Sequence, residues 1–230
     1  MKKAVVLLSG GLDSATTLYL ARKQEYKCFC LIFDYGQRHK KEIESAKKIA
    51  RQANCPCKIL KIKLPWKGSA LLERNITLPK YKKAITQKRD NTIPSTYVPG
   101  RNIIFLSFAL SFAEAIGAEA IFIGAHTQDY SGYPDCRPEF YRAFTKVIST
   151  GTKSGVEKRG IKIQTPLLRK TKAQIIRLGG ELGVPFELTW SCYQGGKSPC
   201  GKCDSCYYRQ KGFHDAGMRD TLSSKAKGVP

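Results

Sequence analysis

The sequence predicts an α/β fold with an open parallel sheet, helices on both of its faces and a small zinc-binding segment at the C-terminus. Three observations lead to this prediction. Apolar runs of strand length alternate with helical patterns, which is typical of parallel βαβ units. The first run, AVVLL, ends in the turn SGGLDS at 9–14, and a helical pattern follows at once. Four of the nine cysteines fall within 192–206, at spacings typical of a metal site.

Each predicted strand is a short apolar run followed by a helical pattern. AVVLL at 4–8 comes first, and its helix at 14–24 takes apolar positions from Ala15, Leu18 and Ala21. The other strands are expected at 27–33, 59–62, 120–124 and 161–164, and the other helices at 38–52, 102–116, 137–150 and 172–182. The glycines of GGELGVP stop the last helix. The predicted organisation is an α/β domain over 1–184 with a basic loop at about 65–99, a zinc-binding segment over 185–215 and a flexible tail over 216–230.

Length and composition describe an ordinary globular protein. At 230 residues the chain suits one domain with a small appendage. No apolar run approaches the roughly 20 residues needed to cross a bilayer, and MKKAVVLL lacks the length and the cleavage site of a signal peptide. We therefore expect a cytoplasmic protein that does not contact a membrane.

The chain is strongly basic, with 40 Lys and Arg residues against 18 acidic ones and a net charge of +22. Such a surplus suits nucleic acids or other polyanions. It does not lie on one helical face, however, because the stretch 58–89 alone holds ten basic residues and a single acidic one, Glu73. A solvated basic loop is the favoured interpretation. A lid over anionic substrates comes second and a nucleic-acid surface third.

The turn SGGLDS has the chemistry of a phosphate site. A strand that runs through a glycine turn into a helix directs backbone N–H groups and the positive helix end at one point. Gly10 and Gly11 permit close backbone approach, and the hydroxyls of Ser9 and Ser14 add donors. Asp13 would repel a bare phosphate, so its presence indicates a bridging Mg²⁺. The segment is neither a Walker A loop nor a GxGxxG fingerprint.

The cysteines separate into a cluster and a dispersed group. Cys192, Cys200, Cys203 and Cys206 read Cys-x7-Cys-x2-Cys-x2-Cys, a spacing that lets four thiolates converge on one Zn²⁺. An iron–sulfur cluster is the main rival. The remaining cysteines, Cys28, Cys30, Cys55, Cys57 and Cys136, are expected to be small apolar residues of the fold.

These motifs together resemble those of the 7-cyano-7-deazaguanine synthases of queuosine biosynthesis. The resemblance rests on SGGLDS, FDYGQRH at 33–39, VPGRN at 98–102, SGYPDCR at 131–137 and the C-terminal SCY…CGKCDSC, and it covers nearly the whole chain. SGGLDS alone resembles the pyrophosphate loop of the wider ATP pyrophosphatase superfamily, whose fold is that of the adenine nucleotide alpha-hydrolases.

The resemblance implies a C–N bond-forming ligase. Its substrates would be 7-carboxy-7-deazaguanine, ammonia and two ATP per turnover, with Mg²⁺, one structural Zn²⁺ and a homodimeric assembly. The acid and then the amide would be adenylated before the nitrile forms. The family's ATP segment would comprise Leu8, Ser9, Gly10, Gly11, Leu12, Asp13, Ser14, Ala15, Thr16, Thr17 and Leu18.

Site residues follow from the motifs and from their position beyond the strand ends. Expected catalytic residues are Asp13, Ser14, Arg101 as an anion clamp, and Lys170, which with Lys172 lies beyond the last strand. Expected substrate-binding residues are Gln37, Arg38, His39, Asp129, Tyr133, Asp135 and Arg137. Asp135 suits the N–H donors of a deazaguanine, with a turn-capping role as the alternative. Arg101 exposed on the surface and ordinary solvated lysines at 170 and 172 remain the other interpretations.

Two rival functions remain open. A tRNA-modifying ATP pyrophosphatase would share the loop and suit the positive charge, but it would give SGYPDCR no role. A zinc-ribbon nucleic-acid module would not need the pyrophosphate loop. Steep salt dependence of RNA binding would support either rival, whereas the synthase needs no nucleic-acid partner.

Overall fold

The computed structural model describes residues 1–79, 93–126 and 133–224. Its centre is a sheet of five parallel strands in the order β3-β2-β1-β4-β5. The strands are β1 (Lys3–Leu7), β2 (Lys27–Asp34), β3 (Cys57–Lys61), β4 (Ala120–Phe122) and β5 (Lys162–Gln164). The fold class and all five predicted strands are thus confirmed, with small shifts at the strand ends. Because β2 and β4 flank β1 on opposite sides, a crevice opens at the carboxyl ends of β1 and β4, where ligands bind in such sheets.

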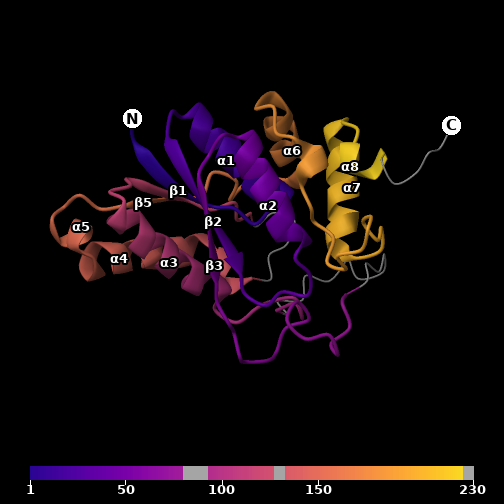
Figure 1. The fold of residues 1–230 in the computed structure, drawn as a ribbon, viewed down its shortest axis with the longest axis horizontal. Helices are drawn as coiled ribbons and strands as arrows, with labels where there is room; N and C mark the ends of the chain where they lie inside the picture. Colours follow the sequence, from indigo (N-terminus) through magenta and orange to yellow (C-terminus); the bar gives the residue numbers. More distant parts are fainter. Residues whose placement is uncertain (80–92, 127–132, 225–230) are drawn as a thin grey trace.

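Helices cover both faces of the sheet (Figure 1). One layer holds α1 (Leu12–Lys23), α2 (Lys41–Gln52) and α6 (Lys172–Glu181), with α7 (Asp204–Ala216) packed on α6. The other holds α3 (Arg101–Ala115), α4 (Pro138–Gly151) and the short α5 (Lys153–Val156). Shorter turns of helix are 3₁₀ at Pro134–Cys136 and Phe186–Leu188, and α8 at Thr221–Ser224.

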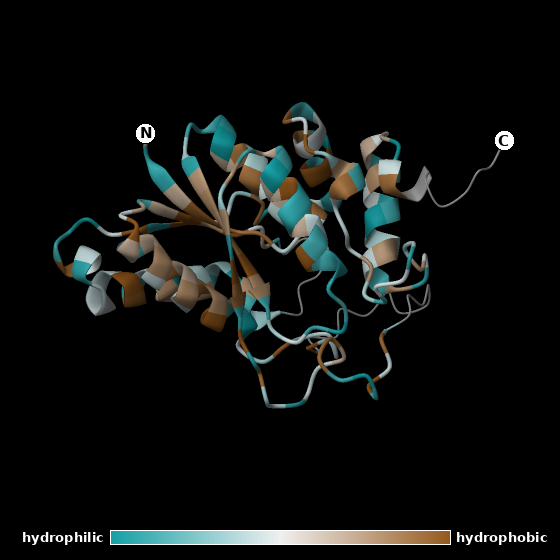
Figure 2. Ribbon diagram, in the orientation of Figure 1, coloured by the Kyte–Doolittle hydropathy of each residue, from teal (hydrophilic) through white to brown (hydrophobic). Residues whose placement is uncertain are grey.

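Two apolar cores lie on the two sides of the sheet. In β1, Ala4 and Val6 face the α1 and α2 side, while Val5 and Leu7 face the α3 side. Both faces are buried, which is why the strands read as continuous apolar runs. Figure 2 shows apolar residues along the strands, whereas many hydrophilic residues lie on the helices of the α1 and α2 layer. The sheet therefore holds the carboxyl ends of its strands rigidly.

The C-terminal part of the chain is more ordered than the sequence predicted. Helix α7, which the strand and helix patterns did not predict, packs on α6 through Gly212, where a Cβ would lie 2.3 Å from the Lys172 Cγ. The predicted tail over 216–230 begins with an anchored section, because Asp220 pairs with Arg209 at 2.7 Å and both side chains are buried. Residues 225–230 and the part of the basic loop at 80–92 lie outside the described residues.

Within the described ranges, no helix is both long and apolar enough to span a membrane.

Candidate active site

The turn between β1 and α1 is held by two serine hydroxyls. The Ser14 Oγ accepts from the Ser9 N–H at 3.2 Å and lies 3.0 Å from the Ser9 Oγ, which accepts from the Gly11 N–H at 3.3 Å. Gly10 has a φ of +86°, and a Cβ there would lie 2.1 Å from the Glu42 carbonyl oxygen. Only glycine lets the turn pack this closely on α2. The first N–H groups of α1 have no partner within the helix, so this turn can receive an anion.

The predicted ATP segment divides into two parts. Its first part lines the cavity described below and comprises Leu8, Ser9, Gly11, Leu12, Asp13 and Ser14. Ala15, Thr16, Thr17 and Leu18 are buried in α1 instead, with the Thr16 and Thr17 hydroxyls donating to carbonyl groups one helical turn earlier. The second part thus supports the turn through the core.

Asp13 forms a cluster with Lys172 and His126. The Lys172 Nζ donates to both Asp13 carboxylate oxygens, at 2.7 and 2.8 Å, and lies 3.0 Å from the His126 Nε2. Burial raises the pKa of Asp13, but Lys172 and His126 outweigh it and hold this pKa well below its usual value. Asp13 is therefore a carboxylate, as a Mg²⁺ ligand must be.

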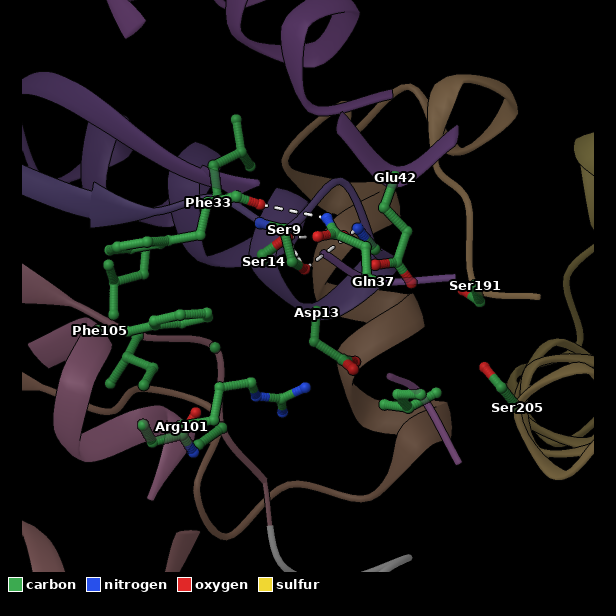
Figure 3. A pocket seen from close by; sticks show the side chains of 18 of the residues that line it. Ser9, Asp13, Ser14, Phe33, Gln37, Glu42, Arg101, Phe105, Ser191 and Ser205 are labelled. Atoms are coloured by element: carbon green, nitrogen blue, oxygen red, sulfur yellow. Dashed lines mark hydrogen bonds between the residues drawn. The ribbon is translucent and has the colours of Figure 1, made fainter. Parts of the chain in front are cut away.

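A cavity of about 350 Å³ opens beside this turn (Figure 3). One end is apolar and aromatic, because Phe33 and Phe105 stack with ring centroids 3.9 Å apart and Tyr35 meets Phe105 edge-on at 5.4 Å. The other end is polar and reaches Ser191 and Ser205. An apolar end joined to an anion-binding turn suits a nucleotide.

The FDYGQRH residues shape one wall of this cavity, and Gln37, Arg38 and His39 all line it. The Gln37 side chain holds its own loop, since its Oε1 accepts from the Tyr35 N–H at 2.9 Å. The Arg38 Nη2 donates to the Glu73, Arg74 and Ile76 carbonyls. Arg38 therefore secures the described part of the basic loop, although the sequence predicted that it would bind substrate. Burial lowers the pKa of His39, whose ring meets that of Trp190 edge-on.

Arg101 and Tyr133 also line the cavity, and Figure 3 shows Arg101 across it from Gln37 and Glu42. Arg101 begins α3, and its Nη1 lies 3.5 Å from the Tyr35 hydroxyl. Tyr133 is hydrogen-bonded through its hydroxyl to the Thr96 hydroxyl at 2.6 Å. The structure thus places Arg101 in the cavity wall and not on the open surface.

Three other predicted residues lie elsewhere. Asp135 is buried, its Oδ2 accepts from the Asn102 N–H at 3.1 Å, and it is not among the lining residues. It caps α3, which is the alternative that the sequence left open, and its substrate-binding role stays a prediction. Arg137 is exposed at the start of α4. Asp129 lies outside the described residues.

The two lysines beyond the last strand lie differently. Lys170 lines neither described cavity, whereas Lys172 contacts Asp13 and lines the smaller cavity of about 170 Å³ behind it. The sequence also gave no role to Glu42, Trp190, Ser191, Tyr193 or Ser205, all of which line the main cavity. The available signal for Glu42 was its position on the first turn of α2, the helix that follows β2.

The four C-terminal cysteines form one cluster. The sulfur atoms of Cys192, Cys200, Cys203 and Cys206 lie within 4.8 Å of one another, and those of Cys200 and Cys206 are 3.9 Å apart. Thiolates bound tetrahedrally at 2.3 Å from Zn²⁺ would lie about 3.8 Å apart, so the cluster fits a metal ion of this kind.

The cysteine cluster is connected to the phosphate turn through Trp190. The Trp190 N–H donates to the Gly10 carbonyl at 2.9 Å, and its Nε1 donates to the Cys192 carbonyl at 2.8 Å. Ser191 lies between these two contacts and lines the cavity. The cysteine segment thus forms part of the cavity wall.

Comparison with known proteins agrees with this arrangement. A family model described as queuosine biosynthesis protein QueC matches residues 3–217. The chain belongs to this family. It is 54% identical over 223 residues to the 7-cyano-7-deazaguanine synthase of Acetivibrio thermocellus, covering 96% of this chain and 97% of that one.

Two further relatives of this QueC-family chain carry the same name. The 7-cyano-7-deazaguanine synthase 2 of Desulfitobacterium hafniense is 51% identical over 229 residues, which cover 99% of this chain and 95% of the relative. The synthase of Picrophilus torridus is 52% identical over 222 residues, covering 96% and 91%.

The capping role of Asp135 predicts a loss of stability. Asp135→Ala removes the acceptor for the buried Asn102 N–H, and we expect the free energy of unfolding to fall by about 1–2 kcal/mol. Urea denaturation measures this change, with Glu139→Ala on the exposed face of α4 as the control. An Asp135→Ala protein with unchanged stability would contradict the capping role.

Proposed function

We propose that this chain converts 7-carboxy-7-deazaguanine and ammonia into 7-cyano-7-deazaguanine while cleaving ATP between its α- and β-phosphates. The observation that carries the proposal is the serine-held turn at Ser9–Ser14, with Asp13 beside it, at the crevice of a parallel sheet. The synthase names of relatives about half identical over nearly the whole chain support this substrate.

The first step in this proposal is adenylation of the substrate acid. A carboxylate is a poor electrophile because its leaving group would be oxide. Attack of its oxygen on the α-phosphate transfers AMP and releases pyrophosphate, and the turn with Ser9, Gly11 and Ser14 would hold that pyrophosphate. Mg²⁺ held by Asp13 would neutralise phosphate charge. Lys172, which contacts Asp13, and Arg101, which lines the main cavity, would stabilise charge on the α-phosphate.

The second half of the reaction uses the same site again. Ammonia attacks the acyl-adenylate to give the amide and AMP. Adenylation of the amide oxygen by a second ATP then lets AMP leave with that oxygen, and the nitrile remains. The aromatic end at Phe33, Tyr35 and Phe105 would hold the adenosine in both steps.

The deazaguanine base of the substrate is assigned to the polar end of the cavity and to the wall that holds Arg101 and Tyr133. Tyr133 is the proposed stacking surface, since its ring lines the cavity beside Arg101. Gln37, Arg38 and His39 would act from the other wall, largely by holding it in place. Asp129, Asp135, Arg137 and Lys170 keep their predicted roles as proposals, Lys170 as a more distant charge.

Further properties complete the proposal. Zn²⁺ is the metal proposed for the cysteine cluster, because four close thiolates suit its tetrahedral preference. The same four-thiolate set leaves no open coordination position, so the ion would be structural. A homodimer in the cytoplasm, without a nucleic-acid partner, is the proposed state.

A single incubation tests the reaction. The purified protein is mixed with Mg-ATP, an ammonium salt and 7-carboxy-7-deazaguanine, and the products are identified by mass spectrometry. Nitrile together with AMP and pyrophosphate is the expected result. AMP without nitrile would contradict the substrate and direct the test to tRNA, and untouched ATP would contradict the role of the turn.

A further inference from the structure

Two carboxylates line the main cavity, and they differ in how they are neutralised. Asp13 is bonded by Lys172 and lies near His126. Glu42, on the first turn of α2, has no hydrogen bond or ion pair to its carboxylate within the described parts of the chain. Figure 3 shows its side chain extending into the cavity beside Gln37. The cavity thus contains one carboxylate that no described residue pairs.

The cationic side chains nearest to Glu42 in sequence are engaged elsewhere. The Lys40 Nζ pairs with Asp34 at 3.3 Å. The Lys41 Nζ lies 4.6 Å from the centroid of the Trp190 ring and donates to the Lys197 carbonyl at 3.3 Å. Neither lysine therefore neutralises Glu42.

Among the residues that the structure describes, Arg101 is the cation that acts on Glu42 electrostatically, and Arg101 also contacts Tyr35. Burial raises the pKa of the Glu42 carboxyl to about 7, with a smaller contribution from Cys192, and the attraction of Arg101 opposes this shift only in part. An unpaired acid of this kind next to a phosphate site is costly unless a ligand supplies a cation or a donor.

The surroundings of Glu42 suit a small cation that carries N–H groups. The Ser191 hydroxyl and the Gln37 side chain line the same cavity as possible acceptors, and the Trp190 ring offers an aromatic face. Mg²⁺ prefers several oxygen ligands together with phosphate, and Asp13 at the turn meets that need. Ammonium needs only a few acceptors and tolerates the aromatic ring.

We propose that Glu42 binds ammonium in this cavity and takes its proton, which delivers ammonia to the acyl-adenylate. This inference rests on the proposed function and assigns the nitrogen substrate of that reaction to a particular residue. No residue among the motifs SGGLDS, FDYGQRH and SGYPDCR fulfils this role in the proposed mechanism.

The proton and electron balance is simple. Ammonium gives one proton to the Glu42 carboxylate, which becomes a carboxylic acid. The nitrogen lone pair of the resulting ammonia forms the C–N bond at the acyl carbon. The bond from this carbon to the AMP oxygen breaks, and AMP leaves with the electron pair. The attached nitrogen then loses a second proton to water, which gives the neutral amide.

Two measurements on the same enzyme test this role. Exchange of labelled pyrophosphate into ATP, with 7-carboxy-7-deazaguanine and without ammonium, reports adenylation alone. Amide and nitrile formation against ammonium concentration reports the later step. For Glu42→Gln we expect exchange within about twofold of the wild type. We expect kcat/KM for ammonium to be lower by about 100-fold, as for loss of a general base.

Two further variants complete the experiment. Glu44→Gln alters an exposed acid on the same helix and should match the wild type in both measurements. Glu42→Asp keeps the carboxylate and should recover part of the ammonium dependence, which also serves if Glu42→Gln folds poorly.

Each remaining result contradicts something specific. Glu42→Gln with an unchanged ammonium dependence would overturn the inference. Equal loss of exchange and of amide formation would also overturn it, because Glu42 would then act in binding ATP, Mg²⁺ or the acid. A wild-type enzyme without any exchange would contradict the proposed function itself, and the inference would fall with it.

Discussion

Asp13→Ala is expected to abolish nitrile formation, with kcat lower by at least about 1,000-fold. Of the cavity-lining residues on α1, Asp13 is the one with a carboxylate. Its side chain is 26% exposed. Its removal would take away the oxygen ligand for Mg²⁺ and release Lys172 from its present position. AMP and pyrophosphate release at saturating Mg-ATP measures the effect.

A second variant separates charge from shape at this position. Asp13→Asn keeps the size of the side chain and a hydrogen-bond acceptor for Lys172, but it lacks the negative charge that a Mg²⁺ ligand needs. We expect it to be nearly as inactive as Asp13→Ala while melting at close to the wild-type temperature. An Asp13→Ala enzyme that keeps normal turnover would remove Asp13 from the reaction.

The parts of the fold that could be predicted are those whose pattern lies in consecutive residues. β1 and β2 are buried on both faces, so AVVLL and the run at 27–33 appear as continuous apolar segments. Helix α7 escaped prediction because it begins directly after Cys203, inside the cysteine spacing, and carries many polar residues. Arg209 on α7 anchors Asp220 in the segment before α8, a pairing that no local pattern shows.

The same distinction applies to the site. The serines and glycines of the phosphate turn are neighbours in sequence, so their chemistry was visible in SGGLDS. Lys172 reaches Asp13 across 159 positions, and which of two nearby lysines does so depends on the direction of the first turn of α6. The partner of Asp135, the Asn102 N–H, is 33 positions away, so no local pattern shows this contact.

Cys203→Ser is expected to remove the metal and to unfold the segment around α7. Cys203 is 3% exposed, precedes α7 as its N-cap and packs with Trp190, Cys192 and Cys206. A structural zinc site can contribute about 10 kcal/mol to folding, so a net loss of about 3 kcal/mol is a modest expectation. For a chain of this size that loss lowers Tm by about 6–12 °C. Calorimetry and metal analysis measure the two changes.

This loss should also reach the active site, because the segment joins the phosphate turn. The Trp190 N–H bonds the Gly10 carbonyl, and Ser191 lines the cavity, so turnover should fall together with metal content. Cys57→Ser is the matched control, since it changes an exposed thiol outside the cluster and should keep metal, Tm and turnover. A metal-free Cys203→Ser protein with unchanged melting would show that the cluster does not stabilise the fold. Iron in place of zinc in the wild type would contradict the proposed metal while leaving the four ligands in place.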